Sequence, residues 1–497
     1  MGRAIGQLVC LSFVIFLTPL GAAADVTLPA VFSEGMVLQQ GTARIWGRSS
    51  EGEKITVKIQ GREVSTVARG GKWLLRLRGL KAGGPWRLEV RGRNTIVIER
   101  VLVGEVWLCG GQSNMAAIVS ESREGAREIA SANNPMIRLL KAPRIEADSP
   151  DIFPGETGRF RFVSRVQREA PDERVTTVWE ECEPATVPRF SAACYFFGRE
   201  LQKARKVPVG LIDASVGATP IEAWMSEQAL AADSDGDREQ VRQPWRPAGL
   251  YNGMIAPFEP YAIKGVVWWQ GEANVNRADQ YQALFPALIR GWRQAWGLGA
   301  FPFIFVQLAT AGPAVPKTEG GLVWGRPALA WAELREAQRR TLSRVPGTAM
   351  VVITDIGGEN YHPDWKQPVG FRLALAARKI AYRERLVYSG PLYAGLKIEG
   401  EAVKLTFQHA GGGLVVRGSE LRGFAVAGKD RIFHAARAEI RANQVILTSP
   451  SVRRPVAASY GWAAHPIGNL FNREGLPASP FRTDSWYTTQ TRPLAPR

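Results

Sequence analysis

The chain has 497 residues, of which 45% are hydrophobic and 22% charged, and its formal net charge is +17 at pH 7. This length allows more than one domain, and the composition is typical of a globular protein with a sizeable core. The Lys and Arg residues are spread along the whole chain. Nucleic-acid-binding proteins more often concentrate them, so we expect no nucleic-acid partner and a basic surface suited to acidic glycans or a negatively charged envelope.

The first 24 residues are typical of a secretory signal peptide. Arg3 precedes the short apolar run Leu8–Leu20, and small residues at 21–24 end in an Ala-x-Ala cleavage pattern. We expect cleavage after Ala24 and a secreted or periplasmic mature chain that begins at Asp25. The run is shorter than the roughly 18 residues of a membrane span, with an uncleaved anchor as the alternative. No second long apolar run follows in the sequence, so we expect no transmembrane segment after cleavage.

Three cysteines remain after signal cleavage, because Cys10 leaves with the signal peptide. An odd count argues against a disulfide framework. Cys182 and Cys194 are the pair that could join in an oxidising compartment, whereas Cys109 is expected to be a buried, inert thiol. The sequence has no CxxC and no Cys/His cluster, so we predict no metal site.

The pattern of apolar and polar residues divides the mature chain into three regions. Residues 25–100 alternate apolar and polar in short runs, which predicts an N-terminal β-sandwich-like domain. Residues 101–388 alternate strands with amphipathic helices, which predicts an α/β catalytic domain, with a Pro-, Arg- and Glu-rich insertion at about 141–188. Residues 389–497 return to β-rich patterns.

The predicted elements are as follows. The expected strands are Lys54–Gln60, Lys72–Arg78, Trp86–Arg91, Asn94–Glu99, Val207–Ser215, Lys264–Trp269, Phe301–Leu308, Met350–Asp355, Leu396–Glu399, Ala402–His409, Gly413–Val416 and Glu439–Leu447. The expected helices are Ser122–Ala132, with Ser122 as N-cap, and Phe190–Lys203, Tyr281–Trp296, Trp331–Ser343 and Val369–Glu384.

One stretch, Val101–Met115, organises the central region. An apolar run rich in Val, Leu and Trp leads into Gly110-Gly111-Gln112-Ser113-Asn114. The run fits a buried strand and the glycine pair a turn at its end, so Ser113 lies where a nucleophile is presented at the mouth of a sheet. On this stretch alone, a serine that caps the next helix fits as well.

Three further turns follow predicted strands and supply the remaining groups. They are Gly217–Thr219, Gly271–Asn274 and Asp355–His362. Parallel α/β sheets place their sites at the carboxyl ends of strands. With Ser113, these turns offer a Ser, a Gly, an Asn and a His, which are the groups that acyl transfer uses as nucleophile, oxyanion donors and base.

The motifs of the mature chain resemble those of the SGNH (GDSL-like) hydrolase superfamily and, within it, the sialate O-acetylesterase family. The resemblance rests on an ordered set of motifs: Phe32–Gln40 (FSEGMVLQQ), Ile45–Gly47, Gly104–Met115 (GEVWLCGGQSNM), Phe190–Leu201, Gly217–Trp224 (GATPIEAW), Leu250–Pro257, Val266–Asn274 (VVWWQGEAN), Leu334–Gln338 and His362–Ala374.

This resemblance implies a parallel sheet flanked by helices, with β-rich regions at both ends, and a reaction that needs no cofactor. It implies that Ser113 is the nucleophile and that the Ser113 N–H, Gly217 and Asn274 form the oxyanion hole. His362 is the implied base; the other histidines lie in the C-terminal β-rich region, away from the strand-end turns.

The sequence offers several candidates for the third catalytic member. The superfamily usually has an Asp three residues before the His, and here that position is Glu359. Asp355, at the end of its strand, is the alternative acid. Glu272 is a third carboxylate, for which we favour a structural role, and a Ser–His dyad assisted by a backbone carbonyl is a fourth arrangement.

The sequence therefore predicts a serine esterase that removes O-acetyl groups from carbohydrates, with O-acetylated sialic acids as the first substrate. An acetylesterase that acts on xylan or other plant or microbial glycans is the alternative. A hypothesis of another class is a non-catalytic glycan-binding protein on an esterase-like scaffold, which would use the chain's 16 Trp residues.

Overall fold

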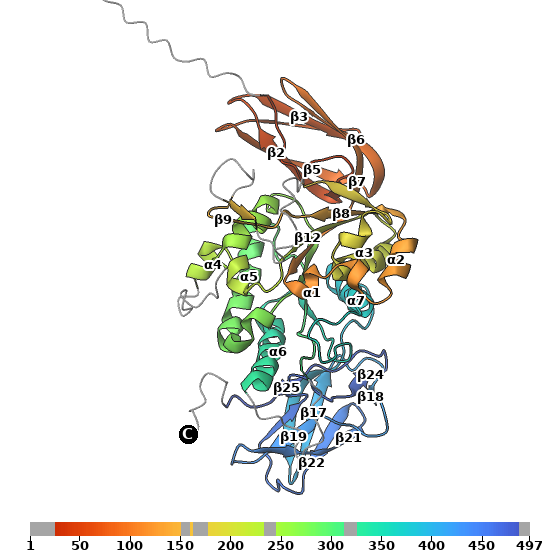
Figure 1. The fold of residues 1–497 in the computed structure, drawn as a ribbon, viewed down its shortest axis with the longest axis vertical. Coiled ribbons are helices and arrows are strands. Elements are labelled where there is room, and N and C mark those ends of the chain that lie inside the picture. The colour runs from red at the N-terminus through yellow and green to blue at the C-terminus, as the bar shows by residue number, and fades with distance from the viewer. Residues whose placement is uncertain (1–24, 151–159, 163–176, 233–244, 313–325, 487–497) are drawn as a thin grey trace, which may run out of the picture.

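The computed structural model describes residues 25–150, 160–162, 177–232, 245–312 and 326–486. Figure 1 shows three regions stacked along the long axis: an N-terminal β region, a central sheet with helices, and a C-terminal β region. The predicted signal peptide and parts of the predicted insertion lie outside the described residues. Within those residues, no helix is both long enough and apolar enough to cross a membrane.

Six parallel strands form the centre of the molecule. In spatial order they are β8 (Asn134–Lys141), β12 (Val209–Ser215), β7 (Thr95–Gly111), β13 (Gly265–Trp269), β14 (Phe303–Val306) and β15 (Thr348–Val351), and β11 (Trp179–Cys182) joins β8 in antiparallel pairing. Of these six strands, β7 comes first in the chain but lies between β12 and β13, so the strand order reverses beside it. Such a reversal is where α/β sheets open a site.

Helices cover both faces of this sheet. Helices α3 (Ala192–Arg205) and α7 (Gln367–Tyr382) pack together on one face, and α5 (Ala278–Trp296) and α6 (Arg326–Arg344) on the other (Figure 1). Because side chains alternate along a strand, Trp107 and Cys109 of β7 join the core that contains α3, whereas Val106 and Leu108 join the core that contains α5. This confirms the predicted α/β fold with a parallel sheet flanked by helices.

Strand β7 belongs to two regions at once. Its residues 95–103 pair with β6 (Gly83–Arg91) in antiparallel fashion, and its residues 105–111 pair in parallel with β12. Arg100, whose φ is 56°, lies in the segment paired with β6. The predicted strand Asn94–Glu99 is therefore the first part of a longer strand, and the predicted boundary after residue 100 falls inside it.

The two outer regions are built from short strands. The N-terminal strands are β1 (Val37–Gln39), β2 (Gly41–Arg48), β3 (Lys54–Ile59), β4 (Arg62–Val67), β5 (Lys72–Leu80) and β6; the C-terminal strands are β16 (Leu392–Glu399), β17 (Ala402–Gln408), β18 (Leu414–Val416), β19 (Phe424–Ala427), β20 (Phe433–Ala435), β21 (Arg437–Arg441), β22 (Gln444–Thr448), β23 (Ala457–Tyr460), β24 (Leu470–Asn472) and β25 (Phe481–Arg482). The shorter elements of the central region are β9 (Ile145–Ala147), β10 (Phe160–Phe162), α1 (Ser113–Ala116), α2 (Gly125–Ser131) and α4 (Glu227–Ala231).

Two local predictions are wrong. The expected strand Glu439–Leu447 is a hairpin, β21–β22, whose turn uses Ala442 at a φ of 52° without a glycine or proline to signal it. Helix α2 begins at Gly125, later than expected, with Glu124 as its N-cap. The Ser122 hydroxyl instead donates to the Val119 carbonyl at 2.7 Å and so does not cap the helix.

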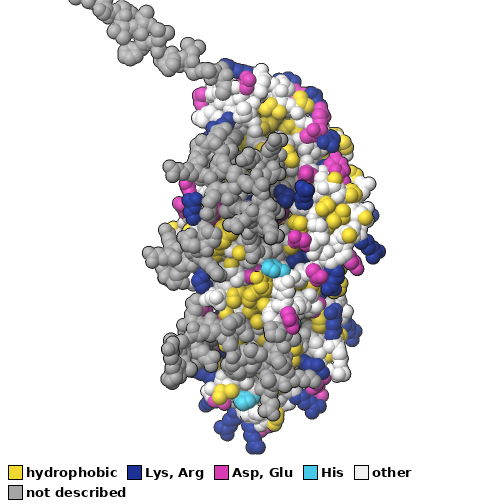
Figure 2. Space-filling view, in the orientation of Figure 1, with side chains coloured by type: hydrophobic (Ala, Val, Ile, Leu, Met, Phe, Trp, Pro, Cys, Tyr) yellow, Lys and Arg dark blue, Asp and Glu magenta, His cyan; other side chains and the backbone are white. Residues whose placement is uncertain are grey.

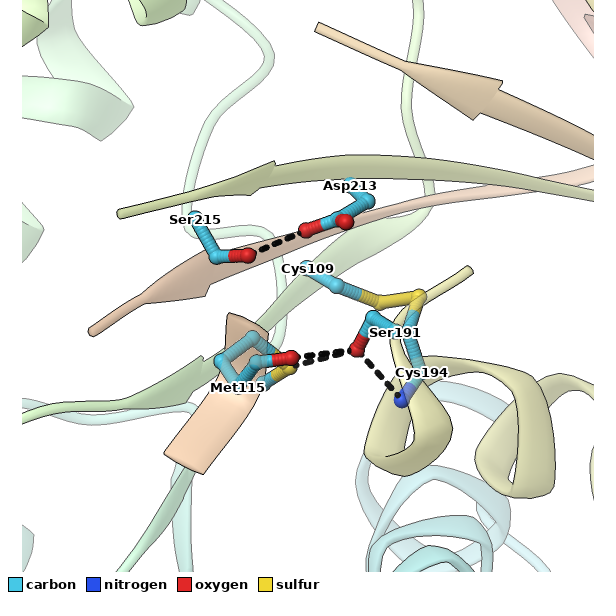
Figure 3. Close-up of a disulfide and its surroundings, with 6 residues drawn as sticks. All are labelled: Cys109, Met115, Ser191, Cys194, Asp213 and Ser215. Carbon is cyan, nitrogen blue, oxygen red and sulfur yellow. Dashed lines mark hydrogen bonds between the residues drawn. A yellow bond between two sulfur atoms is a disulfide. The ribbon is translucent and has the colours of Figure 1, made fainter. Parts of the chain in front are cut away.

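The disulfide pairing predicted from the sequence is also wrong. Cys109 on β7 bonds to Cys194 in the first turn of α3, whereas Cys182 on β11 is a free, buried thiol. Figure 3 shows why: the side chain of Cys109 points to the face of the sheet that α3 covers. Burial raises the pKa of Cys182 to about 11, so Cys182 takes the inert role expected of Cys109.

A buried arginine joins the C-terminal region to the central one. Arg335 of α6 is fully buried and donates to the carbonyls of Leu308 and Ala309 after β14 and to those of Ala463 and Ala464 in the C-terminal region. All four acceptors are neutral, and burial lowers the pKa of Arg335 to about 9. The guanidinium is thus stabilised only while both regions are in place.

The disulfide predicts a simple labelling result. Alkylation of the denatured, unreduced mature protein should modify Cys182 alone, as read by mass spectrometry. Replacing both Cys109 and Cys194 by Ala should destabilise the protein by about 2–5 kcal/mol, because the bond closes a long loop of the unfolded chain. Thermal unfolding of the Cys182→Ala variant is the control. Alkylation of Cys109 in the unreduced protein would contradict the pairing.

Candidate active site

The structure brings Ser113 and His362 into direct contact. The Ser113 hydroxyl oxygen and His362 Nε2 are 2.7 Å apart, although 249 positions separate the two residues in the sequence. Ser113 is the first residue of α1, directly after β7, and His362 lies in the segment between β15 and α7. Both side chains are partly exposed. The short separation of Ser113 Oγ and His362 Nε2 suits proton transfer from a serine to a general base.

Close packing of two turns explains the glycines before the serine. Gly111 has a φ of 136°, and a Cβ added to it would lie 2.1 Å from the Trp269 carbonyl oxygen of β13. Only glycine fits there. The neighbouring Gln112 N–H donates to the same Trp269 carbonyl at 2.9 Å, so the nucleophile turn lies directly on the end of β13.

Side-chain amides bind the three strand-end turns to one another. Gln112 Oε1 accepts from the backbone N–H groups of Gly271 and Ala273, at 3.3 and 3.2 Å. Gln270 Nε2 donates to the Thr219 carbonyl at 3.1 Å and to Asn274 Oδ1 at 2.8 Å. The turns after β7, β12 and β13 therefore form one hydrogen-bonded unit.

The two further oxyanion-hole residues predicted from the sequence lie on this unit. Asn274 is buried, and its Oδ1 also accepts from the Ile221 N–H at 2.9 Å, while its Nδ2 donates to Glu222 Oε2 at 3.0 Å. An amide nitrogen carries two hydrogens, and Glu222 is the one acceptor for them among the described residues, so the second hydrogen is available to a ligand. Gly217 is buried in the turn that follows β12.

The segment that carries His362 is held along its backbone. Thr310 Oγ1 donates to the Gly358 carbonyl at 2.9 Å. The Gly312 N–H donates to the Glu359 carbonyl at 2.8 Å, and the His362 N–H donates to Asn360 Oδ1 at 2.9 Å. His465 also reaches this region from the C-terminal side, because its Nδ1 lies 2.7 Å from the Gly312 carbonyl oxygen.

The three candidate carboxylates have different surroundings. Asp355 forms two 2.7 Å bonds with the guanidinium of Arg372, which occupies both of its oxygens. Glu272 is half-buried and accepts from Asn114 Nδ2 at 2.7 Å, in line with the structural role favoured for it. Glu359 is exposed, and its position three residues before His362 remains the reason to assign it as the acid.

Sequence reasoning missed several residues that build the site. The motifs contain Gln112, Gln270, Glu222, Asn114 and Lys366, but the sequence patterns predict no role for these five residues. Their position is the signal that could have identified them, because most of them stand close in sequence to a predicted nucleophile, donor or base. Polar side chains beside the buried end of a strand need hydrogen-bond partners. Among the described residues, no group of His, Cys, Asp and Glu side chains could hold a metal ion.

Known proteins share this architecture. Residues 103–374 match the model of the family described as carbohydrate esterase, sialic acid-specific acetylesterase. The sialate O-acetylesterase of Homo sapiens is 33% identical over 393 residues, which make up 72% of this chain and 71% of that protein. The sialate O-acetylesterase of Rattus norvegicus is 29% identical over 459 residues, 78% of this chain and 80% of that protein.

One solved structure matches nearly the whole chain. It is a novel carbohydrate acetylesterase from Xanthomonas citri, with a TM-score of 0.80 and 38% sequence identity, and the match covers 93% of this chain and 100% of that one. The similarity therefore extends over both β regions as well as over the central sheet.

The carboxylates predict a pair of contrasting variants. Asp355→Asn should destabilise the protein by about 3–5 kcal/mol, because it leaves the mostly buried Arg372 without its counter-charge, yet the kcat of folded enzyme should change little. With Glu359 assigned as the acid, Glu359→Gln should lower kcat by at least about tenfold, because the imidazole would lose its orienting carboxylate. Hydrolysis of p-nitrophenyl acetate and urea unfolding measure the two effects.

The reverse pattern would overturn the assignment of Glu359. If Glu359→Gln keeps wild-type kcat while folded Asp355→Asn loses it, Asp355 is the acid. If neither variant loses kcat, the pair of Ser113 and His362 acts with support from the backbone alone.

Proposed function

We propose a specific reaction for this chain, which belongs to the carbohydrate esterase family of sialic acid-specific acetylesterases: removal of O-acetyl groups from sugars through an acetyl-enzyme on Ser113. The 2.7 Å contact between Ser113 Oγ and His362 Nε2 is the observation that carries the proposal. Membership of the family makes the chain a carboxylic ester hydrolase that deacetylates carbohydrates.

In the first half of the reaction, His362 takes the hydroxyl proton as Ser113 Oγ attacks the acetyl carbonyl. The carbonyl oxygen becomes an oxyanion, which the N–H groups of Ser113 and Gly217 and the amide of Asn274 stabilise. The tetrahedral intermediate collapses when the carbon–oxygen bond to the sugar breaks, and the imidazolium returns the proton to the leaving sugar oxygen.

In the second half, water replaces the sugar. His362 takes a proton from the water as its oxygen attacks the acetyl-enzyme, and the same donors hold the second oxyanion. Collapse releases acetate and returns the proton to Ser113 Oγ. We assign Glu359 the task of orienting the imidazole through both halves.

O-acetylated sialic acids are the first substrate we propose, because the curated relatives are named sialate O-acetylesterases. The net charge of +17 favours an acidic sugar. This charge belongs to the surface as a whole, because Figure 2 shows Lys and Arg side chains distributed over the visible face rather than in one patch. An acetylated neutral glycan such as xylan is the second candidate. The solved structure from Xanthomonas citri is described only as a carbohydrate acetylesterase, which is compatible with either class of sugar.

We also propose that the protein is exported. The predicted signal peptide supports this, and so does the bond between Cys109 and Cys194, because structural disulfides persist in oxidising compartments.

A side-by-side assay tests the reaction and the substrate class. Acetate release is measured from O-acetyl sialic acids, acetylated xylan and acetylated monosaccharides, with wild type and Ser113→Ala. We expect wild type to turn over at least one sugar substrate and Ser113→Ala to lose at least about 10³-fold in kcat, because the nucleophile is gone. Equal rates for the two proteins would favour the glycan-binding hypothesis instead.

Exposed aromatic side chains beside His362 support a sugar as the substrate. Tyr361 and Trp365 are each 40% exposed. The Tyr361 ring lies 4.2 Å from the His362 ring and 5.9 Å from that of Trp331, and the guanidinium of Arg123 lies 5.3 Å above the Trp365 ring. Such rings offer flat apolar surfaces to the C–H faces of a sugar.

The aromatic residues predict a selective change in KM. Trp365→Ala and Tyr361→Ala should raise KM for an acetylated sugar about 3- to 10-fold through lost stacking, and leave KM for p-nitrophenyl acetate unchanged. Trp86→Ala is the matched control, because Trp86 is 39% exposed and lies on β6 in the N-terminal region. Equal KM changes for both esters, or for the control, would contradict the role in sugar binding.

A further inference from the structure

The residue after the nucleophile makes an unusual set of contacts. Asn114 is fully buried on α1. Its Nδ2 donates to the Tyr361 carbonyl at 2.8 Å and to Glu272 Oε1 at 2.7 Å, and its Oδ1 accepts from Lys366 Nζ at 2.7 Å. Both amide hydrogens are used, and the three bonds permit only one orientation of the amide.

These contacts join the two halves of the catalytic pair. Asn114 directly follows Ser113, and the carbonyl that it binds belongs to Tyr361, which directly precedes His362. The amide therefore connects the backbone on the nucleophile side to the backbone on the base side. Misplacement of a catalytic group by about 1 Å can cost about 100-fold in rate.

A buried lysine and a half-buried glutamate hold the amide from either side. Lys366 is buried just before α7, with Nζ 4.3 Å from the centre of the Trp269 ring. Burial lowers the pKa of Lys366 to about 7, against the raising effects of Glu272 and Asp364. Burial likewise raises the pKa of Glu272, against the hydrogen bond from Asn114 and the charge of Lys366. The attraction between the two groups offsets part of the cost of removing them from water.

We propose that Asn114 and Lys366 are positioning residues for acyl transfer. Asn114 sets the distance between Ser113 Oγ and His362 Nε2 by holding the Tyr361 carbonyl, and Lys366, together with Glu272, keeps the Asn114 amide in the required orientation. This role rests on the proposed function. In this proposal, the position of His362 depends in part on the backbone hydrogen bond at Tyr361. That bond acts in addition to a carboxylate that orients the imidazole ring.

The first test compares two buried asparagines. Asn472 of β24 is also fully buried, and its amide makes three hydrogen bonds, to the Ser389 and His409 carbonyls and from the Leu476 N–H, in the C-terminal region. Asn114→Leu and Asn472→Leu should lower the unfolding midpoint to a similar degree. Only Asn114→Leu should lower kcat for p-nitrophenyl acetate, by at least about 100-fold, with KM within about threefold of wild type.

A second readout reports alignment of the catalytic pair without a sugar. The rate at which a small phosphonate ester inactivates Ser113 should fall in folded Asn114→Leu and stay at the wild-type value in Asn472→Leu. If kcat and the inactivation rate fall equally in both variants, Asn114 has only a structural role and the proposal is wrong. Ser113→Ala separates this result from failure of the proposed function: an active Ser113→Ala would overturn the function itself.

The charged partners are tested by a double-mutant cycle. Lys366→Met removes the cation beside the Glu272 carboxylate and leaves the negative charge of that carboxylate uncompensated, so kcat should fall at least tenfold. Adding Glu272→Gln removes that charge, and the double variant should recover at least threefold over Lys366→Met alone. If the effects of the two single changes on kcat simply multiply, the two side chains act independently and Lys366 does not hold Asn114 in place.

Discussion

The hydrogen bonds of three side-chain amides hold the active site together. Gln112, Gln270 and Asn274 each reach from one strand-end turn to another, so the ends of β7, β12 and β13 cannot move separately. Backbone groups at the ends of buried strands need partners because water does not reach them. Here the partners belong to neighbouring turns, and the same bonds that satisfy the backbone also fix Ser113 and the proposed oxyanion donors.

Two ion pairs near the site join charged side chains to each other rather than to the reacting atoms. Asp355 binds Arg372, and Glu222 binds Arg277, with all four side chains mostly buried. The groups assigned to the oxyanion are a neutral amide and backbone N–H groups. Dipoles fixed in this way stabilise a developing negative charge without the reorganisation that solvent would need. The ion pairs thus give rigidity, and the neutral donors give the chemistry.

The sequence could predict those features that leave a local pattern. Buried runs that end in small polar turns located β7, β12 and β13 and the serine, glycine and asparagine that follow them. Features that depend on pairing across the fold left no such pattern. The partner of Cys194 depends on which face of β7 points to α3, and the continuity of β7 through residue 100 depends on a change of partner strand. The partners of Asp355 and Glu272 likewise became visible only when α7 and α1 were in place.

Arg335 has a consequence for how the regions of this protein can be exchanged between relatives. Its guanidinium is bound by carbonyls from two regions and, in the part of the chain that the structure describes, by no carboxylate. Every residue type has a backbone carbonyl, so the residues at 463–464 can be substituted without loss of these bonds. The path of the backbone at 463–464 has to stay the same. A chimera that takes its C-terminal β region from a relative will therefore be compatible according to loop geometry and not according to percentage identity.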